Sequence, residues 1–330
     1  MSIKPLIQKS VLDVADWTSD AEFAAYPQGA RAKDAVFAPD RPSDKVIVPS
    51  KRYLFKRSKR SYPDQFWGEI IAYRIGCLMG VNVPPAFVAW NSKTGISAAL
   101  IEWFYLDGEV RQKLYPMFDR KDGAEIFHLG GDVLQNIHPT FDRKRGEMHN
   151  IQHIVELMEM LVEKELMENV WKQWLVNMLL FDALIGNTDR HQDNWGLVIS
   201  SINLHFPIRL SPFFDNGTSL GHERFPERVS KWSSKQYDEY IIKGKHHVKW
   251  SLTDDIPIQG HVELLVKVFA KWPDTKKIAH DSLAFTQEDL NGSLADLVSL
   301  GGAVPLSHER IAFVLKLLSN RHTLLKSLFI

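Results

Sequence analysis

The chain has 330 residues, 45% of them hydrophobic and 24% charged, which is the composition of a globular protein with an ordinary core. Forty Lys and Arg residues balance forty Asp and Glu residues, so no overall field favours nucleic acid or an anionic membrane. A single cysteine excludes an internal disulfide. No segment has the roughly 20 apolar residues of a membrane span, and the N-terminus lacks the apolar run of a signal peptide. We therefore expect a cytoplasmic protein.

The first residues of the chain, 1–25, show no clear pattern and are expected to form a strand or an irregular lead-in. The segment QGARAK follows, in which Gly29 lies between small and basic residues. A glycine there allows a turn whose backbone approaches a ligand closely, and with Arg31 and Lys33 nearby that ligand is expected to be a phosphate. Taken in isolation, the same residues also fit an ordinary hairpin turn.

A strand and a helix then bring together two residues of opposite charge. Residues 52–59, RYLFKRSK, alternate as a strand does, with Leu54 and Lys56 on the same face. A lysine on a half-buried face needs an anionic partner because a buried ammonium ion is costly alone. The helix expected between residues 64 and 80 supplies Glu69. A strand lysine paired with a helix glutamate is how protein kinases hold the α- and β-phosphates of ATP, whereas a solvated lysine in a basic segment is the alternative.

Two more predicted strands, in VNVPPAFVAW and ALIEWFYLDG, complete a small α/β lobe. The end of the second strand, residues 101–104, is expected to connect this lobe to the rest of the chain, where backbone groups can bind an adenine ring. We therefore expect an N-lobe of residues 1–105 and a larger, mainly helical C-lobe of residues 106–330. In the C-lobe, one or two long helices are expected in residues 151–185, and polar loops that include His246 and His247 follow residue 220.

The densest polar segment is GNTDRHQDN, residues 186–194, which lies between two apolar segments as a loop at the floor of a cleft does. Asp189 precedes Asn194 in it, and Asp215 follows after a predicted hairpin. Phosphoryl transfer needs one carboxylate facing the attacking hydroxyl, and an amide and a second carboxylate that hold Mg²⁺ on the phosphates. The three residues supply that set in the order that protein kinases use. A helix C-cap followed by solvated turn residues is the alternative for this segment taken alone.

These motifs together resemble the HipA-like serine/threonine kinases, bacterial toxin kinases distantly related in fold to protein and phosphoinositide kinases. The resemblance extends from about residue 29 to beyond residue 215, and GNTDRHQDN is its most specific part, close to the family loop N-x-D-x-H-x-x-N. It implies that Asp189 is the catalytic base and that Asn194 and Asp215 are metal ligands. His191 is expected either to shape the loop or to contact the phosphate or the acceptor.

The resemblance also implies a set of nucleotide-binding residues. QGARAK matches the phosphate-loop segment of the family, Lys56 falls at its ATP-binding lysine with Glu69 as the partner, and IEWF resembles its hinge. The nucleotide-binding residues implied are Gly29, Ala30, Lys33, Lys56, Glu69, Glu102 and Phe104. Two features depart from the family: Tyr26 lies where members often carry an autophosphorylated serine, and the chain resembles the compact members that lack an extra N-terminal subdomain.

The sequence therefore predicts a bilobal, protein-kinase-like α/β fold that binds ATP and Mg²⁺ in the cleft and phosphorylates a protein serine or threonine. The resemblance implies a role as a toxin and an antitoxin partner. The balanced charge and the lack of a membrane span predict no direct nucleic-acid or membrane partner. One alternative is a small-molecule or lipid kinase, since the same three residues serve those enzymes. The other is an inactive, ATP-binding pseudokinase that acts as an interaction module, although the complete set of residues argues against lost catalysis.

Overall fold

Two β-sheets and a set of helices make up the part of the chain that the computed structural model describes, which is residues 2–21, 23, 32–106, 125–201, 203, 205–252 and 260–329. The larger sheet has the order β1-β5-β6-β4-β3-β2, in which β1 is parallel to β5 and the other neighbours are antiparallel. Its strands are β1 (Leu12–Asp13), β2 (Thr18–Ser19), β3 (Lys33–Phe37), β4 (Arg52–Arg57), β5 (Ala86–Asn91) and β6 (Ile96–Glu102).

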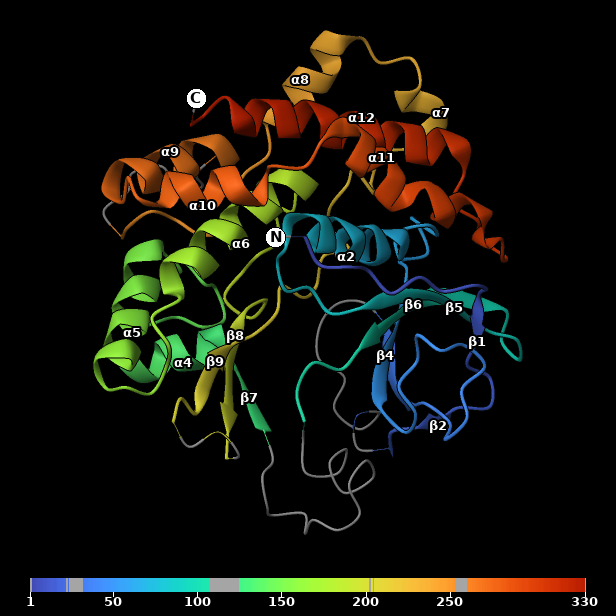
Figure 1. Cartoon of the computed structure of the whole chain (residues 1–330), viewed down its shortest axis with the longest axis horizontal. Helices are drawn as coiled ribbons and strands as arrows, with labels where there is room; N and C mark the ends of the chain where they lie inside the picture. Colours follow the sequence, from blue (N-terminus) through green and yellow to red (C-terminus); the bar gives the residue numbers. More distant parts are fainter. Residues whose placement is uncertain are drawn as a thin grey trace.

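One helix, α2 (Trp67–Met79), lies between this sheet and the C-terminal helices (Figure 1). It begins a little after the expected start near residue 64 and ends at Gly80, whose left-handed backbone (φ 71°) is the C-cap. Its turns approach the following segment so closely that a Cβ on Gly76 would lie 2.4 Å from a methyl group of Val83. Nearly every residue of α2 is buried, so its position is determined by packing on all sides.

The remaining described elements form a three-stranded antiparallel sheet and a helical region. The sheet has the order β7-β8-β9, with β7 (Glu125–Leu129), β8 (Gly196–Ser200) and β9 (Ile208–Leu210). The helices are α4 (Gly130–Ile137), α5 (Ile151–Glu163), α6 (Trp171–Ile185), α7 (Pro226–Val229), α8 (Ser234–Ile242), α9 (His261–Lys271), α10 (Thr275–Ser282), α11 (Gln287–Leu294), the 3-10 helix η1 (Ala295–Leu300) and α12 (His308–Lys326). None of the helices in these ranges is long and apolar enough to span a membrane.

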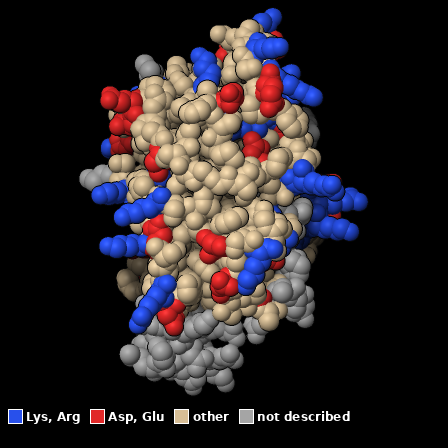
Figure 2. Space-filling model, turned by 90° about the vertical axis from the view of Figure 1, so that its right-hand side faces the viewer, with Lys and Arg blue, Asp and Glu red and all other residues tan. Residues whose placement is uncertain are grey.

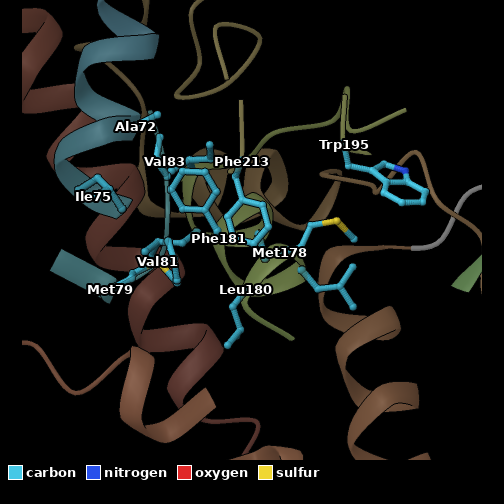
Figure 3. Packing of buried hydrophobic residues seen from close by; sticks show 14 of the residues in the cluster. Ala72, Ile75, Met79, Val81, Val83, Met178, Leu180, Phe181, Trp195 and Phe213 are labelled. Carbon is cyan, nitrogen blue, oxygen red and sulfur yellow. The ribbon is translucent and has the colours of Figure 1, made fainter. Parts of the chain in front are cut away.

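One continuous hydrophobic core joins the larger sheet and α2 to the helices that follow in the chain. Figure 3 shows residues from α2 and the segment after it packed beside Phe181 of α6 and Phe213. Phe181 and Phe213 stack with their ring centroids 5.8 Å apart. Two polar contacts from α2 add to this packing. Arg74 Nη2 lies 2.7 Å from Asp296 Oδ2, and Trp67 Nε1 donates to the carbonyl of Val304 at 3.1 Å. The C-terminal segment therefore holds α2 in place.

Several local expectations after residue 110 are wrong. Residues 125–129 form β7 because they pair with β8, a partner far along the chain that a local pattern does not reveal. The polar loops expected after residue 220 contain α7 and α8, and α8 begins with a capping box between Ser233 and Gln236. His246 lies in a loop, as expected, but it is buried (1% exposed) because it packs against His261, with ring centroids 4.4 Å apart.

On the face shown in Figure 2, basic and acidic side chains are mixed, and neither sign forms a continuous field over that face. This agrees with the equal numbers of basic and acidic residues in the sequence.

Two buried histidines make the stability of the fold sensitive to acid. Burial lowers the pKa of His149 and of His246 to about 3, and neighbouring imidazoles and Arg190 add to the effect. An unfolded histidine has a pKa of about 6.5, so below that pH the unfolded chain binds more protons than the folded one. This contribution to stability is present above pH 6.5 and is lost progressively as the pH falls toward 3.

We therefore expect the free energy of unfolding to decrease between pH 7 and pH 5 by on the order of 2 kcal/mol for each of the two histidines. Urea denaturation of the wild type and of His246→Gln at both pH values measures this effect. The variant, which has no titrating group at this position, should show a smaller decrease by about 2 kcal/mol. An unchanged pH dependence in the variant would show that His246 is not kept neutral by the fold.

Candidate active site

A cavity of about 560 Å³ lies between the larger sheet and the polar loop of residues 187–194. Nine of the residues predicted from the sequence line it: Lys33, Lys56, Glu69, Glu102, Phe104, Asp189, His191, Asn194 and Asp215. The other two, Gly29 and Ala30, lie outside the described residues. The fold thus brings residues from distant parts of the sequence to one site, and their individual roles remain predictions.

Lys56 lies at the centre of a buried network of charges on one wall of this cavity. Its Nζ is 2.7 Å from Glu69 Oε1 and 2.8 Å from Asp215 Oδ1, and its side chain is 4% exposed. The two oxygens of Glu69 also accept hydrogen bonds, from the backbone N–H groups of Asn216 at 2.9 Å and Gly217 at 3.0 Å. The ion pair expected from the sequence is therefore present, and it joins β4 and α2 to the segment that carries Asp215.

Asp215 has an unusual backbone conformation. Its φ is 57°, in the left-handed region that costs energy for residues other than glycine and that Asp and Asn tolerate best. The segment around it is fixed by the bonds from Asn216 and Gly217 to Glu69, so the surrounding structure imposes this conformation. A strained residue that lines a cavity and carries a carboxylate is typical of a functional position.

Arg190 is the buried centre of the polar loop. Its Nε and Nη2 donate to the two carboxylate oxygens of Asp182 in α6, at 3.0 and 2.8 Å, and neither side chain is more than 1% exposed. The guanidinium also donates to the carbonyls of Asn194, at 3.0 Å, and Phe214, and to Asn216 Oδ1 at 2.8 Å. One side chain thus fixes α6, the polar loop and the Asp215 segment relative to one another.

The turn that leads into Asp189 is held by Asn187. Gly186 ends α6 in the left-handed conformation (φ 67°), and Asn187 Nδ2 then donates back to Asp182 Oδ1 at 3.1 Å. Asn187 Oδ1 accepts from the backbone N–H of Asp189 at 3.0 Å, and Nε2 of His261 lies 3.0 Å from the Asn187 carbonyl. These bonds position the backbone of Asp189, whose side chain is left partly exposed in the cavity.

Asn194 and His191 each use one polar atom to hold the loop. Asn194 Nδ2 donates to the carbonyl of Asp189 at 2.6 Å, which leaves its Oδ1 as the atom available to a ligand. His191 Nδ1 accepts from the backbone N–H of Asp193 at 3.2 Å, so Nε2 is the ring nitrogen that remains. An amide oxygen and the Asp215 carboxylate are the hard oxygen donors that Mg²⁺ prefers, and Mg²⁺ takes its other ligands from phosphate and water. Within the described ranges, no cluster of three or more His, Cys, Asp or Glu side chains forms a metal site of the protein alone.

The segment predicted to be the hinge has an open backbone acceptor because of a proline. The N–H of Glu102 donates to the carbonyl of Pro85 at 2.8 Å. In an antiparallel pair the opposite residue normally donates its own N–H to the Glu102 carbonyl. Pro85 has no N–H, so β5 provides no donor for that carbonyl. The side chain of Glu102 is turned to Lys51, with which it forms an ion pair. Phe104, two residues later, stacks on Phe214 with ring centroids 5.3 Å apart, so the hinge side of the cavity combines an apolar wall with a backbone acceptor.

Residues 26–250 match the family model described as the HipA-like C-terminal domain, which covers more than half of the 330 residues. The chain belongs to this HipA-like family. Its fold is similar to that of the Helicobacter pylori proinflammatory kinase CtkA, with a TM-score of 0.71 and 13% identity over 97% of each chain. The fold is therefore mixed α/β, bilobal and kinase-like, as the sequence predicts. The lobe boundary at residues 105 and 106 remains a prediction.

A second similar structure is HipA of Shewanella oneidensis, in a toxin–antitoxin complex with HipB and operator DNA. The TM-score is 0.46 and the identity 11%, over 98% of this chain and 76% of that one. A search of curated proteins found no match. At 13% identity the similarity to CtkA describes the fold alone, and the chemistry has to be argued from the residues of this chain.

Sequence reasoning assigned no role to Arg190 or Asp182. A signal was present, because Asp182 interrupts the apolar helix segment MLLFDALIG, and a buried aspartate requires a cation or a set of donors. The sequence places Arg190 nearby, yet the contacts to Phe214 and Asn216 depend on how the hairpin returns the chain.

We expect Arg190→Lys to destabilise the fold strongly, because lysine cannot form the paired bonds and leaves Asp182 partly unsatisfied. Breaking a buried pair costs roughly 3–5 kcal/mol, whereas an exposed pair contributes under about 1 kcal/mol. Arg209→Lys is the matched control, since Arg209 pairs with Glu125 at 3.0 Å but is 40% exposed. Chemical denaturation of both variants is the measurement, and equal losses of stability would contradict the central role of Arg190.

Proposed function

We propose that this protein is an ATP- and Mg²⁺-dependent phosphotransferase whose acceptor is a serine or threonine of a protein. One observation carries the proposal: a single cavity contains the side chains that phosphoryl transfer needs. They are a lysine held by two carboxylates (Lys56), a partly exposed aspartate in a rigid loop (Asp189), and an amide and a carboxylate suited to Mg²⁺ (Asn194 and Asp215). Membership of the HipA-like family supports the same chemistry.

The nucleotide would occupy the cavity along its apolar and basic walls. The Glu102 carbonyl is the acceptor for an exocyclic amino group of adenine, and the N–H of Phe104 is the neighbouring donor. Lys56 binds the phosphates, because its ammonium group is buried and held in one place by Glu69. An oriented cation in a partly desolvated cavity interacts with phosphate more strongly than one in water.

Asn194 Oδ1 and Asp215 would hold Mg²⁺. A bound Mg²⁺ would supply positive charge that offsets the negative charge of the phosphate oxygens, including the charge that builds up on the ADP leaving group. The contribution of the chain is to preset the two oxygen donors: Arg190 fixes the backbone of Asn194, and Glu69 fixes the segment after Asp215. Such preorganisation avoids the cost of arranging the donors during the reaction.

Asp189 would receive and orient the acceptor. The acceptor oxygen forms a bond to the γ-phosphorus as the bond from phosphorus to the bridging oxygen of ADP breaks, and the hydroxyl proton passes to the Asp189 carboxylate. Thr218 Oγ1 lies 3.5 Å from Asp189 Oδ2, at the limit of a hydrogen bond, so it restricts this side chain without neutralising it. His191, two residues further on, faces both the nucleotide cavity and the surface beyond it.

A role as a toxin with an antitoxin partner is a further part of the proposal and depends on family membership alone. The Shewanella protein forms such a complex with HipB. Co-purification of the chain with a partner encoded beside it would address this part separately.

The two key carboxylates should differ in what their loss does to nucleotide binding. Asp189→Asn should abolish transfer yet change the Kd for Mg-ATP by a few-fold at most, under ~1 kcal/mol, because Asp189 faces the acceptor. Asp215→Asn should lose transfer and also weaken Mg-dependent binding about tenfold or more, ~1.4 kcal/mol.

Isothermal titration of the wild type and both variants, each checked for folding, measures these affinities. The wild type should bind ATP much more weakly in the presence of a chelator. Equal affinities in the two variants would show that Asp215 is not a metal ligand, and no nucleotide binding by the wild type would contradict the proposed function.

A further inference from the structure

A second cavity of about 720 Å³ adjoins the first beyond the polar loop. Arg143, His191 and Asp193 line both cavities, so the two share a wall at the point where the loop passes Asp189. An acceptor hydroxyl that reaches Asp189 must belong to a molecule whose remaining atoms extend out of the nucleotide cavity. The described surface that continues from Asp189 in this direction is the second cavity, which we call the acceptor groove.

The floor of the acceptor groove is built onto the polar loop. Gln192, 6% exposed, donates from Nε2 to the carbonyl of Arg143 at 2.7 Å, and its own carbonyl accepts from the N–H of Gly131 at 2.8 Å. Gly146 has a φ of 64° and lies so close that a Cβ there would be 2.2 Å from Gln192 Oε1. Residues 141–146 are therefore fixed to the same loop that carries Asp189, and the groove is formed before any ligand binds.

Charged side chains lie along the wall that the two cavities share, where Arg143 is placed between two carboxylates. Arg143 Nε lies 3.0 Å from Asp132 Oδ1, and Arg143 Nη2 lies 3.5 Å from Asp193 Oδ1, so the charge of Arg143 is balanced and this wall is polar.

We propose that the acceptor groove binds an extended peptide segment whose serine or threonine reaches Asp189, with the exposed cations Lys144 and Arg145 at its outer rim. This inference rests on the proposed function and adds the place and chemistry of acceptor binding. An extended peptide offers N–H donors and carbonyl acceptors along its length, which suit a groove lined by polar side chains. A lipid would require an apolar wall, which this groove, lined mainly by charged and amide side chains, does not provide.

The outer rim of the groove favours an acidic side chain near the acceptor residue. Lys144 is exposed, and no ion pair of its side chain occurs among the described residues. Arg145 is 70% exposed and only loosely paired, at 3.7 Å from Asp142 and 3.9 Å from Glu147. A carboxylate of the peptide can therefore approach both cations.

Filling the groove tests its role without touching the nucleotide site. Gln135 is exposed on α4 and lines the acceptor groove but not the nucleotide cavity, whereas its neighbour Asn136 is also exposed and lines neither cavity. Three quantities are measured for each variant. The first is the labelling of a degenerate serine/threonine peptide library by labelled ATP. The other two are the affinity for Mg-ATP and the rate of ATP hydrolysis with water as the acceptor. Gln135→Trp should lower peptide labelling at least tenfold and leave the other two readouts unchanged, and Asn136→Trp should match the wild type in all three.

The charge of the rim is tested with the same library, divided into pools with Glu or Lys beside the acceptor residue. The wild type should label the Glu pools more strongly, and Lys144→Glu should remove or reverse this preference. Lys316→Glu, an equal change of net charge at an exposed position on α12, is the control and should keep the preference.

The outcomes separate the two proposals. A wild type that neither binds Mg-ATP nor hydrolyses it would overturn the proposed function. A wild type that hydrolyses ATP but labels no peptide pool would overturn the acceptor groove while the nucleotide chemistry stands. Normal labelling by Gln135→Trp, or a pool preference unaffected by Lys144→Glu, would equally overturn the groove.

Discussion

The buried pair of Arg190 and Asp182 is the interaction on which the candidate site depends. Asp182 lies inside an apolar helix and Arg190 in the loop that follows it, so the pair turns the loop back onto the helix end. The remaining donors of Arg190 then bind the carbonyls of Asn194 and Phe214. A buried ion pair adds little net stability compared with apolar packing, but it restricts geometry when every donor is used. We infer that this pair serves mainly to set the relative positions of Asp189, Asn194 and Asp215.

The second constraint is the fixed position of α2. In the candidate site, Glu69 connects Lys56 with the backbone after Asp215, and this requires α2 at one place between the sheet and the C-terminal helices. The hydrophobic core is continuous across this contact, and Arg74, Trp67 and the segment before α2 are bonded to residues 296–310. The ion pair at Lys56 is thus a property of the whole fold, and the C-terminal helices contribute to the site without lining the cavity.

Much of the fold and of the candidate site could be predicted because the signals are local. Alternation in β4 placed Lys56 on the cavity face, and Leu54 lines the same cavity. The spacing of Asp189, Asn194 and Asp215 identified residues that the structure brings together. Other features depend on contacts between distant residues: Arg190 meets Asn216, β7 pairs with β8, and Pro85 opens the carbonyl of Glu102. No pattern within a single segment contains that information.

If these residues transfer a phosphoryl group, the protein should transfer label from γ-³²P-labelled ATP into the proteins of a cell lysate. With the wild type, the account predicts a small number of labelled bands whose label is on serine or threonine. Asp189→Asn, folded and still able to bind Mg-ATP, should give none of them. A wild type that binds Mg-ATP tightly but labels no protein, or an Asp189→Asn variant that labels the same bands at the same rate, would contradict the account.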